Sequence, residues 1–446
     1  MATPSTPLVP HLFTEAIPAA LKMLSPEQYA AARSAFDSAH TDALSVLGGA
    51  QPSALPRISR EAVLAKAATD PVAAAELAAA LHGLSLPYVD PDGNMWGFGF
   101  LQQLDPGWLL AVLAWLYYPN FDKPAFPKPP RKVVAAPDTM DIAILGDWGG
   151  GPRSAAAVVL DQVKLLSPQP VYTIHLGDVY YFGAPSNGVL GFMGGHAELN
   201  KFVEPWVTGT SGSFTLNSNH EMYAAAQGLI QVALTSPKFA LQQGATYFAV
   251  ENDAFVIVGL DSAYYAEWGN LYMDGNLSPD QIDFLAVQAQ KKTTSGAPKK
   301  LVILTHHTGL NAIGAPWNTV LPSADEARAS ALWQQVTGAL PAGTTAYWYW
   351  GHYHQAAVYA PVTLANGTTI YPRCAGHGCF PFGPAPALAA ATGDTVVWYE
   401  STSVDPGGPN AIYMLNGFAN LSFNGPNLTE TFIDQNGGKY AVPPAG

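Results

Sequence analysis

The stretch that decides the fold is Asp141–Asp147, DIAILGD, followed by Trp148-Gly149-Gly150-Gly151. Its apolar residues predict a short buried strand that ends at a carboxylate and a run of glycines. Four later segments repeat this plan, with an apolar strand followed by Asp, Asn or His: VYTIHLGDVYY (171–181), SFTLNSNHEMY (213–223), KLVILTHHTGL (300–310) and TAYWYWGHYHQ (345–355). Groups just past the carboxyl ends of strands in an α/β sheet converge on one crevice. Five endings with oxygen or imidazole ligands therefore indicate a single metal site.

Length and composition disfavour several classes of protein, among them nucleic-acid-binding and disulfide-rich proteins. The chain has 446 residues, enough for two or three domains, and a net charge of −13, which disfavours broad binding to nucleic acid or anionic membranes. A small phosphate ester is still compatible, because bound cations set the local field. The only cysteines, Cys374 and Cys379, exclude a disulfide-rich scaffold. With His377 between them they offer too few ligands for a zinc site, so a constrained loop is the expectation.

Three regions are expected along the chain. Helix-start signals at 25–28, 70–71 and 105–106 predict a helical accessory domain over residues 1–120. Residues 121–138 contain five prolines and are expected to be a linker. From 139 to 446, strands alternate with helices and then give way to antiparallel strands. The N-terminus lacks a basic start and an apolar core, so we expect no signal peptide and a cytoplasmic location. The most apolar run (108–118) is too short to span a membrane, which takes ~20 residues.

Taken in order, the strand endings resemble the motifs of the calcineurin-like metallophosphoesterases. The matching blocks are Gly146-Asp147-Trp148-Gly149, Gly177-Asp178, Asn219-His220-Glu221, His306 and Gly351-His352-Tyr353-His354. The resemblance implies an α/β fold, a four-layer αββα sandwich, after the N-terminal helical domain. It also implies hydrolysis of phosphate monoesters by a metal-bound hydroxide at a dinuclear centre. Hydrolysis of diesters and a non-catalytic role as a metal-binding interaction protein remain alternatives.

Two departures indicate a branch of that family. Gly149 stands where many members have a histidine ligand, and Gly-Asp-Val-Tyr-Tyr is similar to the Gly-Asp-x-x-Tyr motif of purple acid phosphatases. The resemblance makes Tyr181 a metal ligand and Tyr180 its aromatic neighbour. Two metal ions are implied, iron paired with iron, zinc or manganese. Residues 310–327 contain no histidine, whereas that branch often has substrate-binding histidines there, so monoester preference stays open.

The resemblance also assigns roles to single residues. Asp178 is the expected bridge between the two ions, and catalysis is assigned to His220 and Asp178. One ion is expected to bind Asp147, Asp178, Tyr181 and His354, and the other Asp178, Asn219, His306 and His352. His220 and Asn219 are expected to contact the phosphate ester, and Glu221 to orient His220 from the second layer.

Several histidines and one arginine have competing interpretations. His306 and His307 are adjacent, and the family pattern favours His306 as the ligand. His175 lies within a strand and is expected to be a core residue, and His196 is expected at the surface. Arg153 is equally compatible with phosphate binding and with a solvated role. The natural substrate, the metal pair and the oligomeric state are not determined by these patterns.

Overall fold

The computed structural model describes most of the chain from residue 133 onward. The described ranges are 133–149, 155–183, 198–268, 272–311, 313–314, 324–379, 385–404 and 413–444, with residue 406 and short pieces at 88–89, 95–96, 114–115, 118–119 and 123–127. The predicted helical domain (1–120) lies almost entirely outside them, as do Arg153 and His196. Its described parts include one antiparallel pair, β1 (Tyr88–Val89) with β2 (Met95–Trp96).

A six-stranded sheet carries the first three motif strands. Its strand order is β17-β16-β15-β4-β5-β6, and β4, β5 and β6 run parallel. The C-terminal strands β15, β16 and β17 extend it as antiparallel neighbours, as their turn-rich sequence predicts. The bounds are β4 (Thr139–Leu145), β5 (Tyr172–His175), β6 (Gly212–Thr215), β15 (Gly417–Asn424), β16 (Asn427–Asp434) and β17 (Lys439–Ala441).

A nine-stranded sheet carries the last two motif strands, β9 (Lys300–Thr305) and β10 (Thr345–Trp350), which are parallel neighbours. The strand order is β14-β11-β13-β10-β9-β8-β7-β3, with β12 on β13. The other bounds are β3 (Val133–Ala135), β7 (Phe248–Glu251), β8 (Phe255–Gly259), β11 (Ala356–Tyr359), β12 (Val362–Thr363), β13 (Thr369–Ala375) and β14 (Val396–Tyr399).

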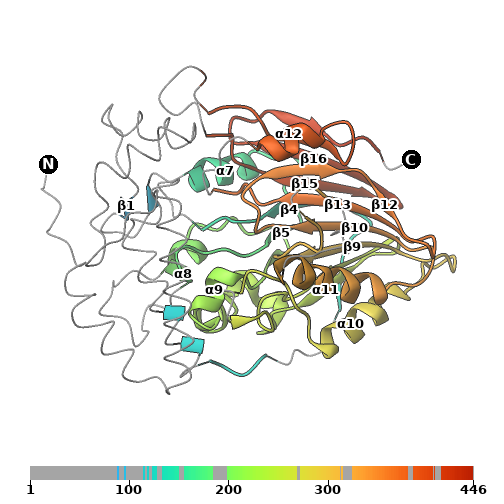
Figure 1. Cartoon of the computed structure of the whole chain (residues 1–446), viewed down its shortest axis with the longest axis horizontal. Coiled ribbons are helices and arrows are strands. Elements are labelled where there is room, and N and C mark those ends of the chain that lie inside the picture. The colour runs from blue at the N-terminus through green and yellow to red at the C-terminus, as the bar shows by residue number, and fades with distance from the viewer. Residues whose placement is uncertain are drawn as a thin grey trace, which may run out of the picture.

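The two sheets pack face to face with helices outside them (Figure 1). Along β4, Ile142 and Ile144 enter the core between the sheets, while Ala143 and Leu145 face the outer core with α7 (Ala155–Lys164). This alternation is the two-residue period of a strand. On the opposite side, α10 (Pro279–Ala289) and α11 (Ala324–Gly338) cover the nine-stranded sheet. The predicted four-layer αββα sandwich is confirmed.

The remaining helices are short and lie between strands. They are α8 (Glu198–Val203), α9 (Asn219–Tyr223), η4 (Leu229–Ala233), η5 (Pro237–Gln242) and α12 (Pro386–Ala391). Within the described ranges no helix is both long and apolar enough to cross a bilayer.

The boundary of the predicted linker differs from the structure at one place. β3 lies inside residues 121–138, and it pairs in parallel with β7 at the edge of the nine-stranded sheet. Its two adjacent valines favour a strand, and that preference outweighs the prolines on either side. The sheet therefore begins before residue 139.

A buried ion pair joins the two sheets. Arg373 of β13 donates to both carboxylate oxygens of Glu430 of β16, at 2.9 Å each, and Tyr349 of β10 donates to the same carboxylate. The side chains of Arg373 and Glu430 are only 3% and 5% exposed. Such a pair fixes how the sheets face each other, because neither charge has access to water.

We predict that Glu430→Gln lowers the free energy of unfolding by roughly 3–5 kcal/mol, because it leaves the Arg373 charge buried and uncompensated. Urea unfolding of the variant measures this. The control is Asp161→Asn, which breaks the exposed Lys164–Asp161 pair (2.8 Å) and should cost under about 1 kcal/mol. Equal losses in the two variants would contradict the structural role given to the buried pair.

Candidate metal centre

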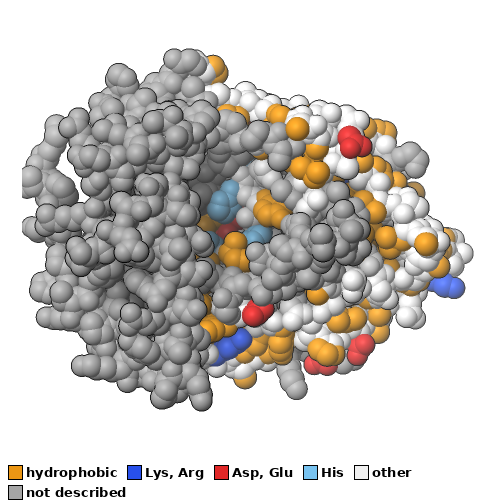
Figure 2. All heavy atoms as spheres, in the orientation of Figure 1, with side chains coloured by type: hydrophobic (Ala, Val, Ile, Leu, Met, Phe, Trp, Pro, Cys, Tyr) orange, Lys and Arg blue, Asp and Glu red, His pale blue; other side chains and the backbone are white. Residues whose placement is uncertain are grey.

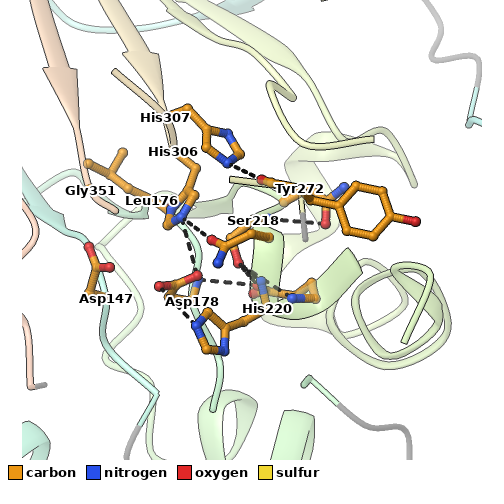
Figure 3. A network of polar contacts seen from close by, with 12 residues as sticks. Asp147, Leu176, Asp178, Ser218, His220, Tyr272, His306, His307 and Gly351 are labelled. Atoms are coloured by element: carbon orange, nitrogen blue, oxygen red, sulfur yellow. Dashed lines mark hydrogen bonds and ion pairs between the residues drawn. The ribbon is translucent and has the colours of Figure 1, made fainter. Parts of the chain in front are cut away.

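The five motif endings meet where the parallel strands of both sheets end (Figure 3). Asp147 and Asp178 follow β4 and β5, and Asn219 opens α9 after β6. From the other sheet, His306 follows β9, and His352 and His354 follow β10. Asp147, Asp178 and His352 have positive φ values of 56°, 75° and 63°. Such non-glycine conformations are strained and cluster at functional sites.

His306 shows most directly that a cation fits this place. Its Nδ1 lies 2.9 Å from the carbonyl oxygen of Leu176, which can only accept, so Nδ1 carries the proton. Burial lowers the pKa of His306 to about 4, so the ring is neutral and Nε2 presents a lone pair. That lone pair faces Asn219 Oδ1 at 2.9 Å and Asp178 Oδ1 at 3.2 Å. Three lone pairs that converge without a proton need a cation.

The two aspartates also indicate that a cation fits at this place. Asp147 is fully buried, and neither of its carboxylate oxygens has a hydrogen-bond partner among the described residues. Burial, followed by the charge of Asp178, raises the pKa of Asp147 well above its usual value. Both carboxylates can be ionised together only if positive charge lies between them. The donor set of carboxylate, amide and imidazole suits iron, manganese or zinc.

His354 and Tyr180 stand beside this acidic pair. His354 Nε2 lies 3.4 Å from Asp147 Oδ1 and 3.7 Å from Asp178 Oδ2. The hydroxyl of Tyr180 donates to Asp178 Oδ2 at 3.1 Å and lies 3.0 Å from His354 Nε2. Burial, followed by the charges of Asp178 and Asp147, raises the pKa of Tyr180 well above 10. The backbone of Tyr181, the expected ligand, donates to Glu198 and accepts from His220.

The adjacent histidines take different positions. His306 faces the acidic pair, whereas His307 points to Tyr272 (Figure 3), whose carbonyl oxygen lies 2.8 Å from Nε2. Nδ1 of His307 lies 2.9 Å from Ser262 Oγ, so both ring nitrogens are occupied. The ring of His352 lies 5.1 Å from that of His306 and 4.8 Å from that of His307. The His307 ring is therefore held by its own hydrogen bonds and packs against the ring of His352.

His220 and Glu221 occupy places that the motif alone did not specify. His220 donates from Nδ1 to the carbonyl oxygen of Tyr181 at 2.7 Å, and its Nε2 lies 3.9 Å from Asp178 Oδ2. Glu221, the residue predicted to orient His220, accepts from the backbone N–H of Asp178 at 3.2 Å and from the Ser218 hydroxyl. Burial, then the Asp178 charge, raises the pKa of Glu221 to about 8. Glu221 thus supports the backbone of Asp178.

The glycines of the motifs allow the backbones to approach closely. A Cβ on Gly149 would lie 2.6 Å from Val179 Cα and closer still to the carbonyl oxygen of Asp178. With this backbone, the histidine that many family members carry at this place cannot fit. A Cβ on Gly351 would lie 2.5 Å from Asp147 Oδ2. Without side chains at these glycines, the loop after β10 approaches Asp147 closely and the loop after β4 approaches Asp178 closely.

Other candidates lie outside the centre. His175 is fully buried and hydrogen-bonded to the carbonyl oxygen of Trp148 (2.8 Å) and to Thr215 (3.1 Å), which agrees with a core residue. Cys374 and Cys379 are not disulfide-bonded. Cys379 accepts from the backbone N–H of Gly149 at 3.3 Å, so it braces the glycine loop.

The centre lies at the bottom of a hollow (Figure 2). Histidine and acidic side chains are visible there, with hydrophobic side chains around them. One hydrophobic neighbour is Met273, which is 45% exposed and contacts Asn219 through its sulfur at 3.7 Å. A ligand could thus reach the acidic pair past an apolar rim.

The family comparison agrees with this geometry. Residues 140–356 match the model of the calcineurin-like phosphoesterases. This segment is a calcineurin-like phosphoesterase domain. Its matched range runs from β4 to the start of β11 and includes every motif described above. Among curated proteins no sequence matches the chain significantly.

Two solved structures are distantly similar to this chain. The anchor GAP50 of the inner membrane complex of Plasmodium is 10% identical, with a TM-score of 0.44 over 69% of this chain and 90% of that one. A structure of PhoD is 12% identical, with a TM-score of 0.40 over 72% of this chain and 74% of that one. Similarities this weak support no conclusion about activity.

We predict that Gly149→Ala lowers the free energy of unfolding by roughly 1–3 kcal/mol, because the added Cβ forces the two metal-site loops apart. Metal content per chain should fall with it. The control is Gly338→Ala at the end of α11, where a Cβ meets nothing within 4 Å and stability should hold or rise. Unchanged stability and metal content in Gly149→Ala would contradict this close approach.

Proposed function

We propose that the protein is a metal-dependent phosphoesterase that hydrolyses phosphate monoesters at a centre of two metal ions. The observation that carries the proposal is the position of Asp178. Its Oδ1 faces His306 at 3.2 Å, while its Oδ2 faces His354 at 3.7 Å. One carboxylate with its two oxygens in two ligand sets is suited to bridge two cations.

The two ligand sets follow from this bridge. Asp147, Asp178 and His354 would hold one ion, with Tyr181 as the resemblance implies, and Asp178, Asn219, His306 and His352 would hold the other. When bound, the ions would supply charge for the phosphoryl oxygens and acidify a water molecule. Leu176 fixes the His306 tautomer through its carbonyl oxygen, and Glu221 holds the backbone of Asp178. The protein's part is thus to orient the ligands at the bottom of the hollow.

His220 is the proposed acid beside the centre. Because the Tyr181 carbonyl takes the Nδ1 proton, Nε2 is the nitrogen left to face a substrate. A protonated Nε2 can hydrogen-bond a phosphoryl oxygen or deliver its proton to the leaving group. Asn219, whose amide nitrogen contacts Tyr223 at 3.3 Å, is the proposed second contact to the ester.

Phosphodiester hydrolysis is the second candidate, and a specific observation favours it. Met273, which contacts Asn219, is apolar and 45% exposed. The second organic group of a diester could pack against it. Turnover of p-nitrophenyl phosphate against bis(p-nitrophenyl) phosphate separates the two candidates. Turnover of neither, in protein that holds two metal ions per chain, would support a non-catalytic metal-binding protein.

We predict that Asp178→Asn lowers both metal content and phosphate release by roughly 100-fold or more, because the bridge loses its charge. Metal analysis and a phosphate-release assay measure this on the same sample. Asp161→Asn, the same change at an exposed position on α7, should leave both unchanged. Full turnover by Asp178→Asn would refute the proposed function.

We predict that His220→Asn lowers turnover by roughly 10²–10⁴-fold on an alkyl phosphate, with a much smaller loss on p-nitrophenyl phosphate. The difference arises because p-nitrophenolate leaves without a proton, whereas an alkoxide needs one. Metal content should stay at the wild-type level. Equal losses on both substrates would contradict an acid role for His220.

A further inference from the structure

The thiol of Cys374 lies at the loop that carries the two histidines after β10. In β13, Cys374 pairs with Trp350, the last residue of β10, on one side and with Ala357 of β11 on the other. The loop from β10 to β11 therefore crosses the end of β13 at this residue. The Cys374 side chain is fully buried, and neither proposed ligand set includes it.

Three backbone carbonyl groups of this loop face the thiol. Cys374 Sγ lies 3.2 Å from the carbonyl oxygen of Gln355, 3.3 Å from that of Tyr353 and 3.9 Å from that of Gly351. Burial raises the pKa of the Cys374 thiol, so the group keeps the proton that it donates. Along the chain, these carbonyl groups alternate with the two histidines.

The loop consists of two three-residue turns with a histidine at the centre of each. The N–H of Tyr353 donates to the carbonyl oxygen of Gly351, and the N–H of Gln355 donates to that of Tyr353, both at 2.6 Å. His352, at the centre of the first turn, has a positive φ of 63°, which is strained for a residue with a side chain. A contact that holds the carbonyl groups of these turns also fixes the direction of the two imidazole rings.

The end of β13 also contacts the loop of Asp147. The carbonyl oxygen of Ala375 accepts from the N–H of Gly146 at 2.9 Å. A Cβ on Gly376 would lie 2.7 Å from Asp147 Oδ2 and closer still to the carbonyl oxygen of Tyr353. This end of β13 thus joins the loops after β4 and β10, which carry proposed ligands of the same ion.

A core-filling role is the competing interpretation of Cys374. The residue belongs to the apolar cluster that α10 and α11 cover. If it only fills space, alanine should serve better than serine, because a buried hydroxyl without a required partner is unfavourable. If it donates a hydrogen bond to the loop, serine should serve better than alanine. The two interpretations therefore predict opposite orders.

We propose that Cys374 is a positioning residue of the metal centre, whose thiol holds the carbonyl groups of the β10–β11 loop so that His352 and His354 face the ions. The inference rests on the proposed metal centre and adds one residue to the contacts that support it. Cys374 acts through the backbone of the loop and is not itself a ligand.

The test is the affinity for Mn²⁺ of the full-length protein after its metal has been removed, measured by titration. Cys374→Ala should weaken Mn²⁺ binding by roughly 10–100-fold, the usual effect of losing a contact that orients a ligand. Cys374→Ser keeps a donor of similar shape and should bind Mn²⁺ almost as tightly as the wild type.

The matched control is Ile370→Val, which removes one methyl group from the same face of β13 and the same apolar cluster. Urea unfolding of the metal-free protein should show a loss of stability in this variant. Its affinity for Mn²⁺ should equal that of the wild type, because Ile370 does not contact the loop through a donor.

Two results would overturn the proposal. One is wild-type affinity for Mn²⁺ in Cys374→Ala. The other is a loss in Cys374→Ser as large as that in Cys374→Ala. If Cys374→Ala does not fold, Cys374→Val takes its place, since valine is apolar and lacks a donor, and wild-type affinity in that variant would equally overturn the proposal.

Phosphate release from the same samples separates this proposal from the proposed function. Mn²⁺ binding without turnover, with the difference between serine and alanine intact, would keep the role of Cys374 and refute the esterase activity. Turnover with equal Mn²⁺ affinity in all the variants would keep the activity and refute the role of Cys374.

Discussion

The structure depends on how two carboxylates can be buried side by side. Asp147 and Asp178 are at most 1% exposed, and burial together with the neighbouring charge raises the pKa of Asp147. A pair of this kind is unfavourable in a protein interior unless cations offset both charges. The lone pairs of His306 and Asn219 point into the same space. We infer that the centre is built to be stable with metal bound.

The sandwich holds these groups in place from two sides. The aspartates and Asn219 come from the six-stranded sheet, and the histidines after β9 and β10 come from the nine-stranded sheet. A shift of one sheet against the other would separate the two halves of the ligand sets. The Arg373–Glu430 pair and the shared apolar core oppose such a shift. Packing remote from the centre thus controls its geometry.

A second layer of contacts orients the ligands. It consists largely of backbone groups: the Leu176 carbonyl at His306, the Tyr181 carbonyl at His220 and the Tyr272 carbonyl at His307. Backbone carbonyls only accept hydrogen bonds, so each fixes which ring nitrogen carries the proton. At Glu221 the roles differ, because here the side chain accepts a hydrogen bond from a backbone N–H group, that of Asp178. Motif patterns cannot show these contacts, because any residue type supplies a carbonyl group.

The sequence by itself determined the strand endings, their order and hence the fold class, because buried strands and ligand-type residues leave a periodic local pattern. It also distinguished His306 from His307 through the family pattern, and the structure places His306 at the acidic pair. The tertiary structure alone decided that Tyr180 meets Asp178 and His354, that β3 joins the sheet and that Glu221 supports Asp178. These features depend on the direction of a side chain or on a partner far along the chain. Local spacing does not encode either, since both are set by packing between the two sheets.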